Sequence, residues 1–307
     1  MIIEIAGVGH INKGAELMLL CATAALKQHY GPSIITVLRP LRGNLKSFEN
    51  IVRYNSYPIA SLKIHNFDFG QYVGNKLPET ILRTFGCFKE KEINVVLDAS
   101  GLRYSDNFGE KPARIAYSEY VKIKQRGGKI ILLPQAFGPF SNKKLKRTVR
   151  EIIEIADLVY ARDKESYFYL NEIVSSGKIE ISGDFTNLLE VQLEESLFRY
   201  RNKICFIPNS KMITENTGLQ RNAYITGITS VINEVEKKNF ECIILNHDGD
   251  FDNKLCREII DGTNLSKDRY VHSLNAYQTK AIIGNSLGVF TSRFHGLASS
   301  LSQGVPS

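Results

Sequence analysis

Short apolar runs alternate with helical patterns along almost the whole chain, and this alternation constrains the fold more than any other feature. The runs are continuous and rich in Ile, Val and Leu, which is typical of parallel strands buried on both faces of a sheet. They cover residues 2–8, 34–38, 93–99, 129–133, 158–161, 179–182, 204–207, 242–245, 270–272 and 288–291, with helical patterns at 14–29, 113–125, 143–156, 164–173, 222–238, 252–260 and 276–283. The sequence therefore predicts an α/β fold of doubly wound, Rossmann-like sheets.

The alternation is lost at residues 183–200, which carry Glu190, Glu194 and Glu195. We interpret this stretch as the connection between an N-terminal α/β domain, residues 1–190, and a C-terminal α/β domain, residues 200–307. Residues 42–90 are harder to assign, and their segments rich in Gly and aromatic side chains are expected to form a mobile loop or a helical insert that faces an acceptor. Val305, close to the last residue of the sequence, is expected to begin a further strand. The second domain is therefore predicted to be incomplete, and the chain to be either a fragment or naturally short.

The chain carries a net charge of +7 and has a pI of about 9.0. Its densest basic cluster lies in the helical pattern at 143–156, where a solvated helix face is favoured over a membrane-surface patch. Because no aromatic side chains alternate with these basic residues, nucleic acid is not expected as a partner. A peripheral position at the inner face of the membrane stays open, since an anionic lipid surface also suits a basic protein.

Targeting and cysteine patterns point to a cytoplasmic protein. The N-terminus has no basic region before its apolar run and is interpreted as a strand, and no apolar run approaches the ~20 residues that span a membrane. The five cysteines are scattered without a CxxC pair, so neither a disulfide framework nor a zinc site is indicated. Most of them lie in apolar contexts and are expected in the core.

An arginine, a histidine and a glycine lie where the last apolar run turns into a helical segment of small residues. The turn reads Thr291-Ser292-Arg293-Phe294-His295-Gly296. Such turns are the usual ligand sites of open α/β sheets, because the N–H groups and dipole of the following helix favour an anion. A guanidinium adds a bidentate clamp, and an imidazole adds a proton carrier near neutral pH. The turn therefore predicts proton-assisted chemistry on a substrate that carries a phosphate or a carboxylate.

Four strand ends of the first domain also carry glycine-rich or polar loops. The first loop, at residues 7–16, lacks the GxGxxG spacing of dinucleotide-binding turns, so NAD binding is only weakly indicated. A tight turn without a ligand is an equal alternative. Asp98 and Asp106 are candidates for binding sugar hydroxyls or for a base, and a cap or turn role is an alternative for Asp106. Arg162 is a candidate anion ligand, with a salt bridge to a local carboxylate as the alternative. The candidate binding residues of these loops are Gly9, His10, Asn12, Gly14, Ser100, Gly101, Asp106, Gln135 and Gly138.

Loops at one edge of each sheet are expected to line a cleft between the two domains. The first domain would contribute the candidates just named together with Arg162, and the second Ser292, Arg293, His295 and Gly296. No metal is expected at this site, because three carboxylates do not cluster in the sequence and the ligand types do not suit a closed zinc site.

An ordered set of these motifs resembles the polysaccharide pyruvyl transferase family and spans nearly the whole chain. The matching segments are Asn12-Lys13-Gly14-Ala15-Glu16, Asp98-Ala99-Ser100-Gly101, Pro134-Gln135-Ala136-Phe137-Gly138-Pro139, Ala161-Arg162-Asp163 with Ser166, Ser292-Arg293-Phe294-His295-Gly296, and Gly304-Val305-Pro306. Two departures stand out. The family often has Asn-x-Gly-Asp in the first turn, where this chain has Asn12-Lys13-Gly14-Ala15-Glu16. Family members also continue past the last motif into a strand and usually a helix, which this sequence does not include.

The resemblance implies a two-domain fold similar to GT-B glycosyltransferases. It also implies transfer of the enolpyruvyl group of phosphoenolpyruvate onto two hydroxyls of a sugar, or of a lipid-linked oligosaccharide, to form a pyruvate ketal in a surface polysaccharide precursor. No cofactor is expected besides this donor substrate. We assign His295 as the general acid and Arg293 and Arg162 as anion contacts.

Two other functions remain open at this point. A GT-B-type glycosyltransferase that uses a nucleotide sugar would also need a cationic site, with Arg293 on the diphosphate. A non-catalytic binding or remnant protein would explain an incomplete second domain.

Overall fold

The computed structural model describes residues 1–307 except 10–11, 41–45, 65–66, 176 and 214–220. Contacts divide the chain into two compact units, each described here by itself. Unit 1 consists of Met1–Val8 and Met18–Phe185, and unit 2 of Gly9–Leu17 and Thr186–Ser307. The segment Gly9–Leu17, which the sequence-based division includes in the first domain, has its contacts in unit 2.

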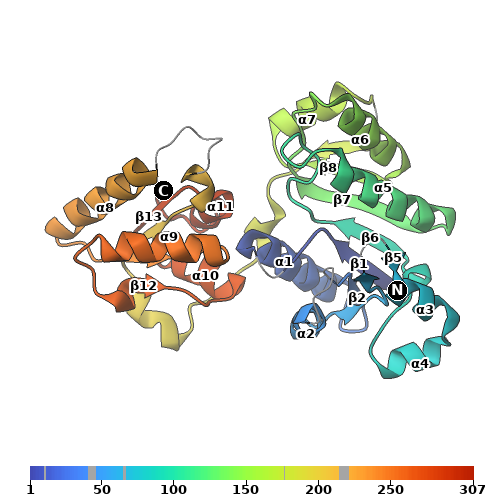
Figure 1. The fold of residues 1–307 in the computed structure, drawn as a ribbon, viewed down its shortest axis with the longest axis horizontal. Helices are drawn as coiled ribbons and strands as arrows, with labels where there is room; N and C mark the ends of the chain where they lie inside the picture. Colours follow the sequence, from blue (N-terminus) through green and yellow to red (C-terminus); the bar gives the residue numbers. More distant parts are fainter. Residues whose placement is uncertain (10–11, 41–45, 65–66, 176, 214–220) are drawn as a thin grey trace. The chain divides into compact units, whose positions relative to one another are not determined.

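Unit 1 is built on a parallel sheet of seven strands in the order β3-β2-β1-β6-β7-β8-β9 (Figure 1). The chain leaves β1 in one direction along the sheet and leaves β6 in the other, which is the doubly wound arrangement. The strands are β1 (Ile2–Ala6), β2 (Ile35–Leu38), β3 (Tyr57–Pro58), β6 (Val95–Asp98), β7 (Lys129–Gln135), β8 (Leu158–Ala161) and β9 (Ile179–Ile181).

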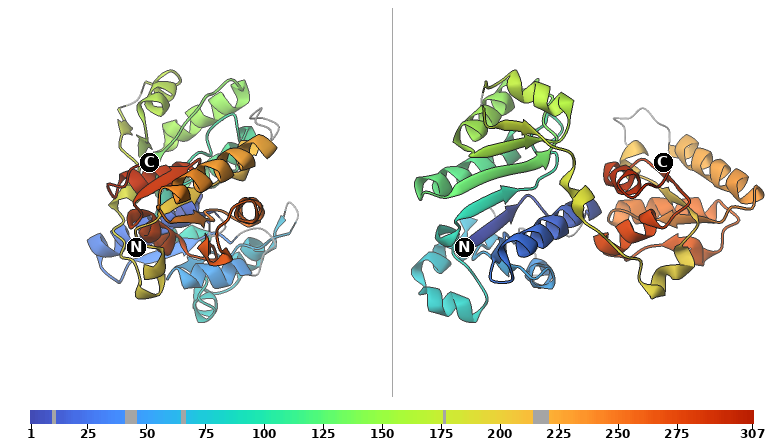
Figure 2. Two further views of the ribbon diagram at one scale, coloured as in Figure 1. Left: turned by 90° about the vertical axis from the view of Figure 1, so that its left-hand side faces the viewer. Right: turned by 180° about the vertical axis from the view of Figure 1, so that it is seen from behind.

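Helices cover both faces of this sheet. Helices α5 (Glu110–Gln125) and α6 (Lys143–Ile155) pack against each other on one face. The right-handed crossover from β1 to β2 runs the opposite way along the sheet and places α1 (Lys13–Tyr30) on the other face (Figure 2). Apolar side chains of α5 and α6, among them Ile123 and Ile152, are fully buried against the strands.

An insert between β2 and β6 holds short elements, so the expectation of a helical insert at 42–90 is met where the structure describes it. Its elements are α2 (Lys46–Arg53), the hairpin β4 (Lys63–Ile64) with β5 (Phe67–Asp68), α3 (Phe69–Lys76), α4 (Glu79–Thr84) and the 3₁₀ turn η1 (Glu90–Glu92). After β8, α7 (Lys164–Asn171) starts at Asp163, whose carboxylate accepts the Ser166 amide at 2.7 Å. Two 3₁₀ turns, η2 (Phe185–Leu188) and η3 (Glu195–Tyr200), follow β9.

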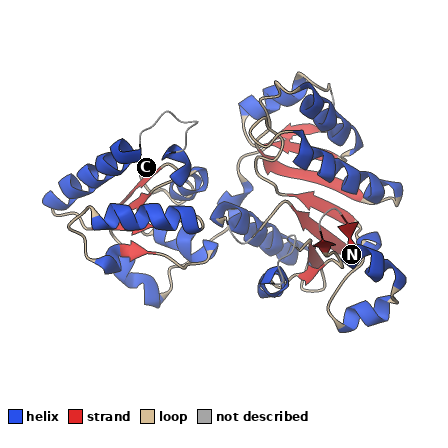
Figure 3. Cartoon of the chain, in the orientation of Figure 1, coloured by secondary structure: helices blue, strands red, loops and turns tan. Residues whose placement is uncertain are grey.

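Unit 2 contains a parallel sheet of four strands in the order β12-β11-β10-β13 (Figure 3). Its elements are β10 (Ile204–Ile207), η4 (Ser210–Ile213), α8 (Arg221–Lys237), β11 (Cys242–Leu245), α9 (Asp250–Asp261), η6 (Lys267–Arg269), β12 (Tyr270–Val271), α10 (Ala276–Gly284), β13 (Gly288–Thr291) and α11 (Phe294–Leu301). Beside β13, the Val289 amide donates to Pro306 O at 2.9 Å, and Val305 is 6% exposed in the core.

The two parallel sheets confirm the predicted fold class of doubly wound α/β units. Strands at 158–161, 204–207, 242–245 and 288–291 match the sequence-based boundaries, and the other predicted strands differ by a few residues at their ends. The short strands β3, β4 and β5 were not predicted. All five cysteines are free, and all except Cys87 are buried, as expected. No helix among the described residues is long and apolar enough to cross a membrane.

Candidate functional site

The candidate site of unit 2 lies at the carboxyl ends of β10, β11 and β13, where three loops and the first turn of α1 meet. The loops carry Asn209 and Ser210 after β10, His247 and Asp248 after β11, and Arg293 and His295 after β13. The carboxyl ends of parallel strands lie at one edge of a sheet, so the topology itself brings these side chains together. Hydrogen bonds between them fix the arrangement.

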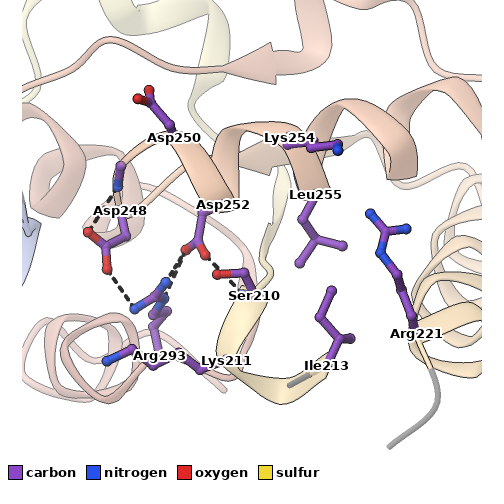
Figure 4. Close-up of a pocket in the computed structure, with 11 residues that line it drawn as sticks. Ser210, Lys211, Ile213, Arg221, Asp248, Asp250, Asp252, Lys254, Leu255 and Arg293 are labelled. Carbon is purple, nitrogen blue, oxygen red and sulfur yellow. Dashed lines mark hydrogen bonds and ion pairs between the residues drawn. The ribbon is translucent and has the colours of Figure 1, made fainter. Parts of the chain in front are cut away.

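Arg293 is held by two carboxylates of its own unit (Figure 4). Its Nε donates to Asp252 Oδ2 at 2.9 Å, and its Nη1 donates to Asp248 Oδ2 at 2.8 Å. Arg293 is 9% exposed and Asp252 is 1% exposed, so this ion pair is largely removed from water. In the described structure, the guanidinium predicted to clamp a substrate anion therefore orders the loops around it.

Asp248 also receives a hydrogen bond from the beginning of α1. Asn12 Nδ2 donates to Asp248 Oδ2 at 3.0 Å, while Asn12 Oδ1 accepts the amides of Gly14 at 2.8 Å and Ala15 at 3.2 Å. Asn12 is thus the N-cap of α1 and a contact to the β11 loop at once. This links a residue predicted to bind substrate to the Arg293 ion pair.

His295 packs directly on the first turn of α1. A Cβ placed on Gly14 would lie 2.2 Å from His295 Nδ1 and 2.6 Å from its Cε1, distances that no real contact allows. The glycine is therefore required by the close approach of the imidazole to the helix backbone. The structure brings together Asn12, Gly14, Arg293 and His295, four of the residues predicted for the site.

A second histidine, His247, lies beside this cluster and was not singled out in the sequence. It is 5% exposed, and burial together with the positive charges of His295, Arg293 and Lys13 lowers its pKa to about 3. His247 therefore stays neutral at physiological pH. Burial makes the largest contribution to this shift, and the neighbouring positive charges add to it.

A pocket of about 670 Å³ adjoins the ion pair. In Figure 4, Lys254, Leu255, Ile213 and Arg221 lie along its other walls, and the Asp250 carboxylate points away from Arg293. Lys254 is exposed, whereas Arg221 pairs with Glu258 at 2.5 Å. The pocket combines cationic and acidic side chains with an apolar wall, and its exposed Lys254 offers a contact for an anionic ligand with a carbon skeleton.

The remaining predicted residues of unit 2 support the loop after β13. Ser292 Oγ lies 2.6 Å from the Tyr224 hydroxyl, and Ser292 O accepts from Asn209 Nδ2 at 2.9 Å. Gly296 lies against Thr291, whose Oγ1 would be 2.6 Å from an added Cβ. For Gly9, no heavy atom of the described residues beyond its chain neighbours lies within 4 Å of an added Cβ, and His10 is outside the described residues.

Several predicted residues of unit 1 have structural partners. Gln135 is fully buried and accepts from Ser100 Oγ at 2.8 Å, and Asp106 accepts the amides of Ser141 and Asn142 at 2.7 and 3.2 Å. Asp98, a candidate base, is also fully buried and accepts from the Tyr104 and Tyr120 hydroxyls. It is therefore enclosed, and sugar hydroxyls have no direct path to it.

Gly101, Gly138 and Arg162, the remaining predicted residues of unit 1, each have a defined neighbour. Gly101 lies beside Met18, and Gly138 lies against the Tyr169 ring and precedes Pro139. Arg162 Nη1 is 3.6 Å from Asp184 Oδ2, the local carboxylate contact named as its alternative. Burial lowers the pKa of Arg162 despite the opposing effects of Asp184 and Asp163. The expected cleft between the domains stays a prediction.

The comparisons with known proteins bear on this site. The model of the polysaccharide pyruvyl transferase family matches residues 12–307, which is nearly the entire chain. The chain belongs to the polysaccharide pyruvyl transferase family. It is therefore a transferase by family, as the ordered motifs predicted, and Asn12, Arg293 and His295 all lie in the matched range.

Solved structures with a similar fold are distant in sequence. The UDP-GlcNAc 2-epimerase from Methanocaldococcus jannaschii has a TM-score of 0.55 at 12% identity, with 100% of this chain and 82% of that chain covered. A glycosyltransferase from Rickettsia africae has a TM-score of 0.53 at 14% identity over 99% and 77% of the chains. The Neisseria meningitidis UDP-GlcNAc 2-epimerase, solved bound to UDP-GlcNAc, has a TM-score of 0.53 at 11% identity over 99% and 80%. These neighbours confirm the GT-B-like fold class.

A search of curated proteins found no match. Among the described residues, no group of three His, Cys, Asp or Glu side chains is arranged to hold a metal ion.

Sequence reasoning missed the acidic half of the site, Asp248 and Asp252, together with His247. A usable signal was present, because Asn246-His247-Asp248-Gly249 follows the apolar run 242–245 and so lies at a strand's carboxyl end. The same argument that singled out Arg293 would have placed these residues beside it.

We expect Gly14→Ala to displace His295, because the new methyl group overlaps the imidazole. The displacement should be visible as a changed His295 side-chain NMR signal. Alanine gains ~1 kcal/mol of helix propensity over glycine, so a fall in the free energy of unfolding would arise from the clash alone. Gly227→Ala in α8 is the matched control, since among the described residues outside its own helix no heavy atom lies within 4 Å of its added Cβ. An unchanged His295 signal in Gly14→Ala would contradict this packing.

We expect His247 to make unit 2 less stable as the pH falls below 6.5. Its pKa of about 3 in the folded state lies below the unfolded value, so the unfolded chain binds the extra proton between these pH values. Between pH 7 and pH 5 this costs about 2 kcal/mol, and above pH 6.5 the full stability is present. His247→Gln should remove that difference in denaturant titrations at the two pH values. An equal loss in both proteins would show that His247 titrates normally.

Proposed function

We propose that this protein transfers the enolpyruvyl group of phosphoenolpyruvate to two hydroxyls of a sugar in a polysaccharide precursor. Family membership supports a pyruvyl transfer reaction, and the observation that carries the proposal is the placement of His295. Its imidazole, at the start of α11 and two residues after Arg293, packs on Gly14. An imidazole held in this way is suited to deliver a proton to a bound anion.

In the proposed reaction, His295 protonates the methylene carbon of phosphoenolpyruvate. The resulting oxocarbenium-like carbon is attacked by one sugar hydroxyl, whose proton passes to the phosphate group of the donor. The bond from this carbon to the phosphate oxygen then breaks, and the second hydroxyl adds to the same carbon to close the ketal. Inorganic phosphate leaves with its bonding electrons, and the proton released by the second hydroxyl restores the imidazolium. A bound phosphate dianion would keep His295 charged until it donates.

Phosphoenolpyruvate carries a carboxylate and a phosphate, so its binding requires more than one cationic side chain. Asp248 and Asp252 balance Arg293, and Glu16 pairs with Lys13 at 2.7 Å. Asp252 is buried, but Asp248 is 18% exposed, so Asp248 is the carboxylate that a substrate oxyanion can replace on Arg293 Nη1. We keep Arg162 as a proposed second anion contact, and Lys254 at the pocket wall is available for the phosphate.

The acceptor is proposed to be a sugar, free or on a lipid carrier, at the cytoplasmic face of the membrane. No cofactor is needed besides phosphoenolpyruvate, because the donor already carries the activated enol. The assay combines the full chain, phosphoenolpyruvate and candidate acceptors, and measures phosphate release with the mass gain of a pyruvyl ketal. Transfer of sugar from a nucleotide sugar without phosphoenolpyruvate would instead establish a glycosyltransferase.

We expect His295→Gln to lower kcat by about 10²–10⁴-fold with little change in KM, because a proton donor acts mainly in the transition state. Glutamine is similar in size and polarity, but its amide protons are not acidic enough to be transferred. His272→Gln is the control, since His272 is an exposed histidine of the same unit whose Nδ1 lies 2.8 Å from Ser273 Oγ. A normal kcat in a folded His295→Gln variant would remove this residue from the acid role.

We expect Asp248→Asn to lower the KM for phosphoenolpyruvate by about fivefold, since a unit charge 4 Å from the substrate contributes ~1 kcal/mol even in water. The substitution removes the carboxylate that competes for Arg293. Asp250→Asn is the matched control, because the Asp250 carboxylate points away from Arg293 (Figure 4). If both variants keep the KM of the unchanged protein, Arg293 does not contact the substrate and acts only in positioning the loops.

A further inference from the structure

Unit 1 has a topological switch point between β1 and β6. In the order β3-β2-β1-β6-β7-β8-β9, the connections after β1 and β6 depart in opposite directions. In open α/β sheets, the carboxyl ends of two such strands leave a crevice where ligands bind. Two loops border it here, namely the turn that begins at Gly7 after β1 and the loop from Ala99 to Arg103 after β6.

Arg103 lies against the turn after β1. A Cβ on Gly7 would be 2.6 Å from Ser100 Cα and 2.9 Å from Arg103 Nη2, and Gly7 has a φ of 76°. The positive φ and the close approach of the Ser100 backbone therefore require glycine at this position. The Arg103 guanidinium therefore lies against Gly7 at the switch point, and 23% of the Arg103 side chain is exposed.

A buried network behind Arg103 holds it in place. Asp98 is fully buried and accepts from the hydroxyls of Tyr104 and Tyr120, and Asp98 Oδ1 accepts the Ser100 amide at 3.0 Å. Burial, together with the Asp98 carboxylate, raises the pKa of both phenols, so both remain protonated donors. The network thus gives the carboxylate a fixed position from which it orients the arginine.

Asp98 attracts the Arg103 guanidinium by charge, but it does not accept a hydrogen bond from it. The distance from Arg103 Nη1 to Asp98 Oδ2 is 3.8 Å, which is beyond a hydrogen bond. Elsewhere in the described part of the chain, no carboxylate lies within ion-pair distance of this guanidinium. Burial lowers the pKa of Arg103 and Asp98 raises it, with a net increase, so the guanidinium is permanently charged. Besides its contact with Tyr104, the guanidinium has further N–H donors for a ligand, because arginine carries five.

We propose that Arg103 and the turn at Gly7 form an oxyanion-binding subsite at the switch point of unit 1. The ligand is a carboxylate or phosphate group, and Arg103 is its bidentate contact. Assigning that group to a substrate rests on the proposed function. Its source is either the donor phosphoenolpyruvate or a phosphate on the acceptor, and the experiment separates the two.

The test is Arg103→Gln, with Arg147→Gln as the control because Arg147 is 79% exposed and pairs with Glu151 on the surface. Binding of inorganic phosphate and of phosphoenolpyruvate is measured by calorimetry, and KM is measured for donor and acceptor. We expect Arg103→Gln to weaken phosphate binding about tenfold or more, as loss of a charge-assisted contact does. Arg103→Lys should keep part of the affinity, since it keeps the charge but not the bidentate geometry.

The outcomes distinguish the ligand sources. A weakened affinity for phosphoenolpyruvate in Arg103→Gln assigns the subsite to the donor. An unchanged donor affinity with a higher KM for a phosphorylated acceptor assigns it to the acceptor. If the unchanged protein shows no pyruvyl transfer, the proposed function is overturned. The calorimetric binding of phosphate still tests whether Arg103 forms an oxyanion-binding subsite.

A folding control is needed because Arg103 faces a buried carboxylate. If Arg103→Gln does not fold, the double variant Arg103→Gln with Asp98→Asn removes both charges together. Wild-type affinity for phosphate and phosphoenolpyruvate in either folded variant, with an unchanged KM for both substrates, overturns the subsite. The absence of phosphate, donor and acceptor binding in the unchanged protein overturns it as well.

Discussion

The buried ion pair between Arg293 and Asp252 is the interaction on which the unit 2 site depends. Asp252 Oδ1 accepts the Ser210 amide at 2.9 Å, so the loop after β10 is attached to the same carboxylate as the loop after β13. Through Asp248 the pair reaches the loop after β11 and the cap of α1. Removing one partner of a buried pair leaves an uncompensated charge at a cost of about 3–5 kcal/mol. An Arg293→Ala variant would therefore lose the geometry of all three loops together with any substrate contact.

The two units place arginine differently at the carboxyl edges of their sheets. In unit 2 the Arg293 guanidinium is hydrogen-bonded directly by carboxylates, and its charge is largely balanced. In unit 1 the carboxylate behind Arg103 is occupied by two phenols and acts over 3.8 Å. The first arrangement rigidifies loops, whereas the second leaves hydrogen-bond donors available. A carboxylate near an arginine therefore does not by itself say whether that arginine is structural or a ligand contact.

Much of the fold could be predicted from the sequence because buried parallel strands are short, apolar and continuous, as at 204–207 and 242–245. The position of Arg293 at a strand end followed from the same pattern. The strand-end pattern also marks His247 and Asp248, but it does not show which acidic residues pair with Arg293, because Asp248 and Asp252 are distant from it in sequence. Likewise, Gln135 looked like a binding residue in a rigid loop, whereas it is enclosed by Ser100 and the sheet. Burial of that kind depends on long-range packing, which local patterns do not encode.

Helix α1 contributes its first turn to unit 2 and its remaining residues to unit 1. The usual way to study a two-domain enzyme is to express each domain as a separate fragment cut in the connecting segment. Here a fragment that begins at Thr186 would lack Asn12 and Gly14, and so the surface on which His295 rests. For this chain, reassembly of the site from separate fragments would require the N-terminal helix turn to be supplied in trans or joined ahead of Thr186.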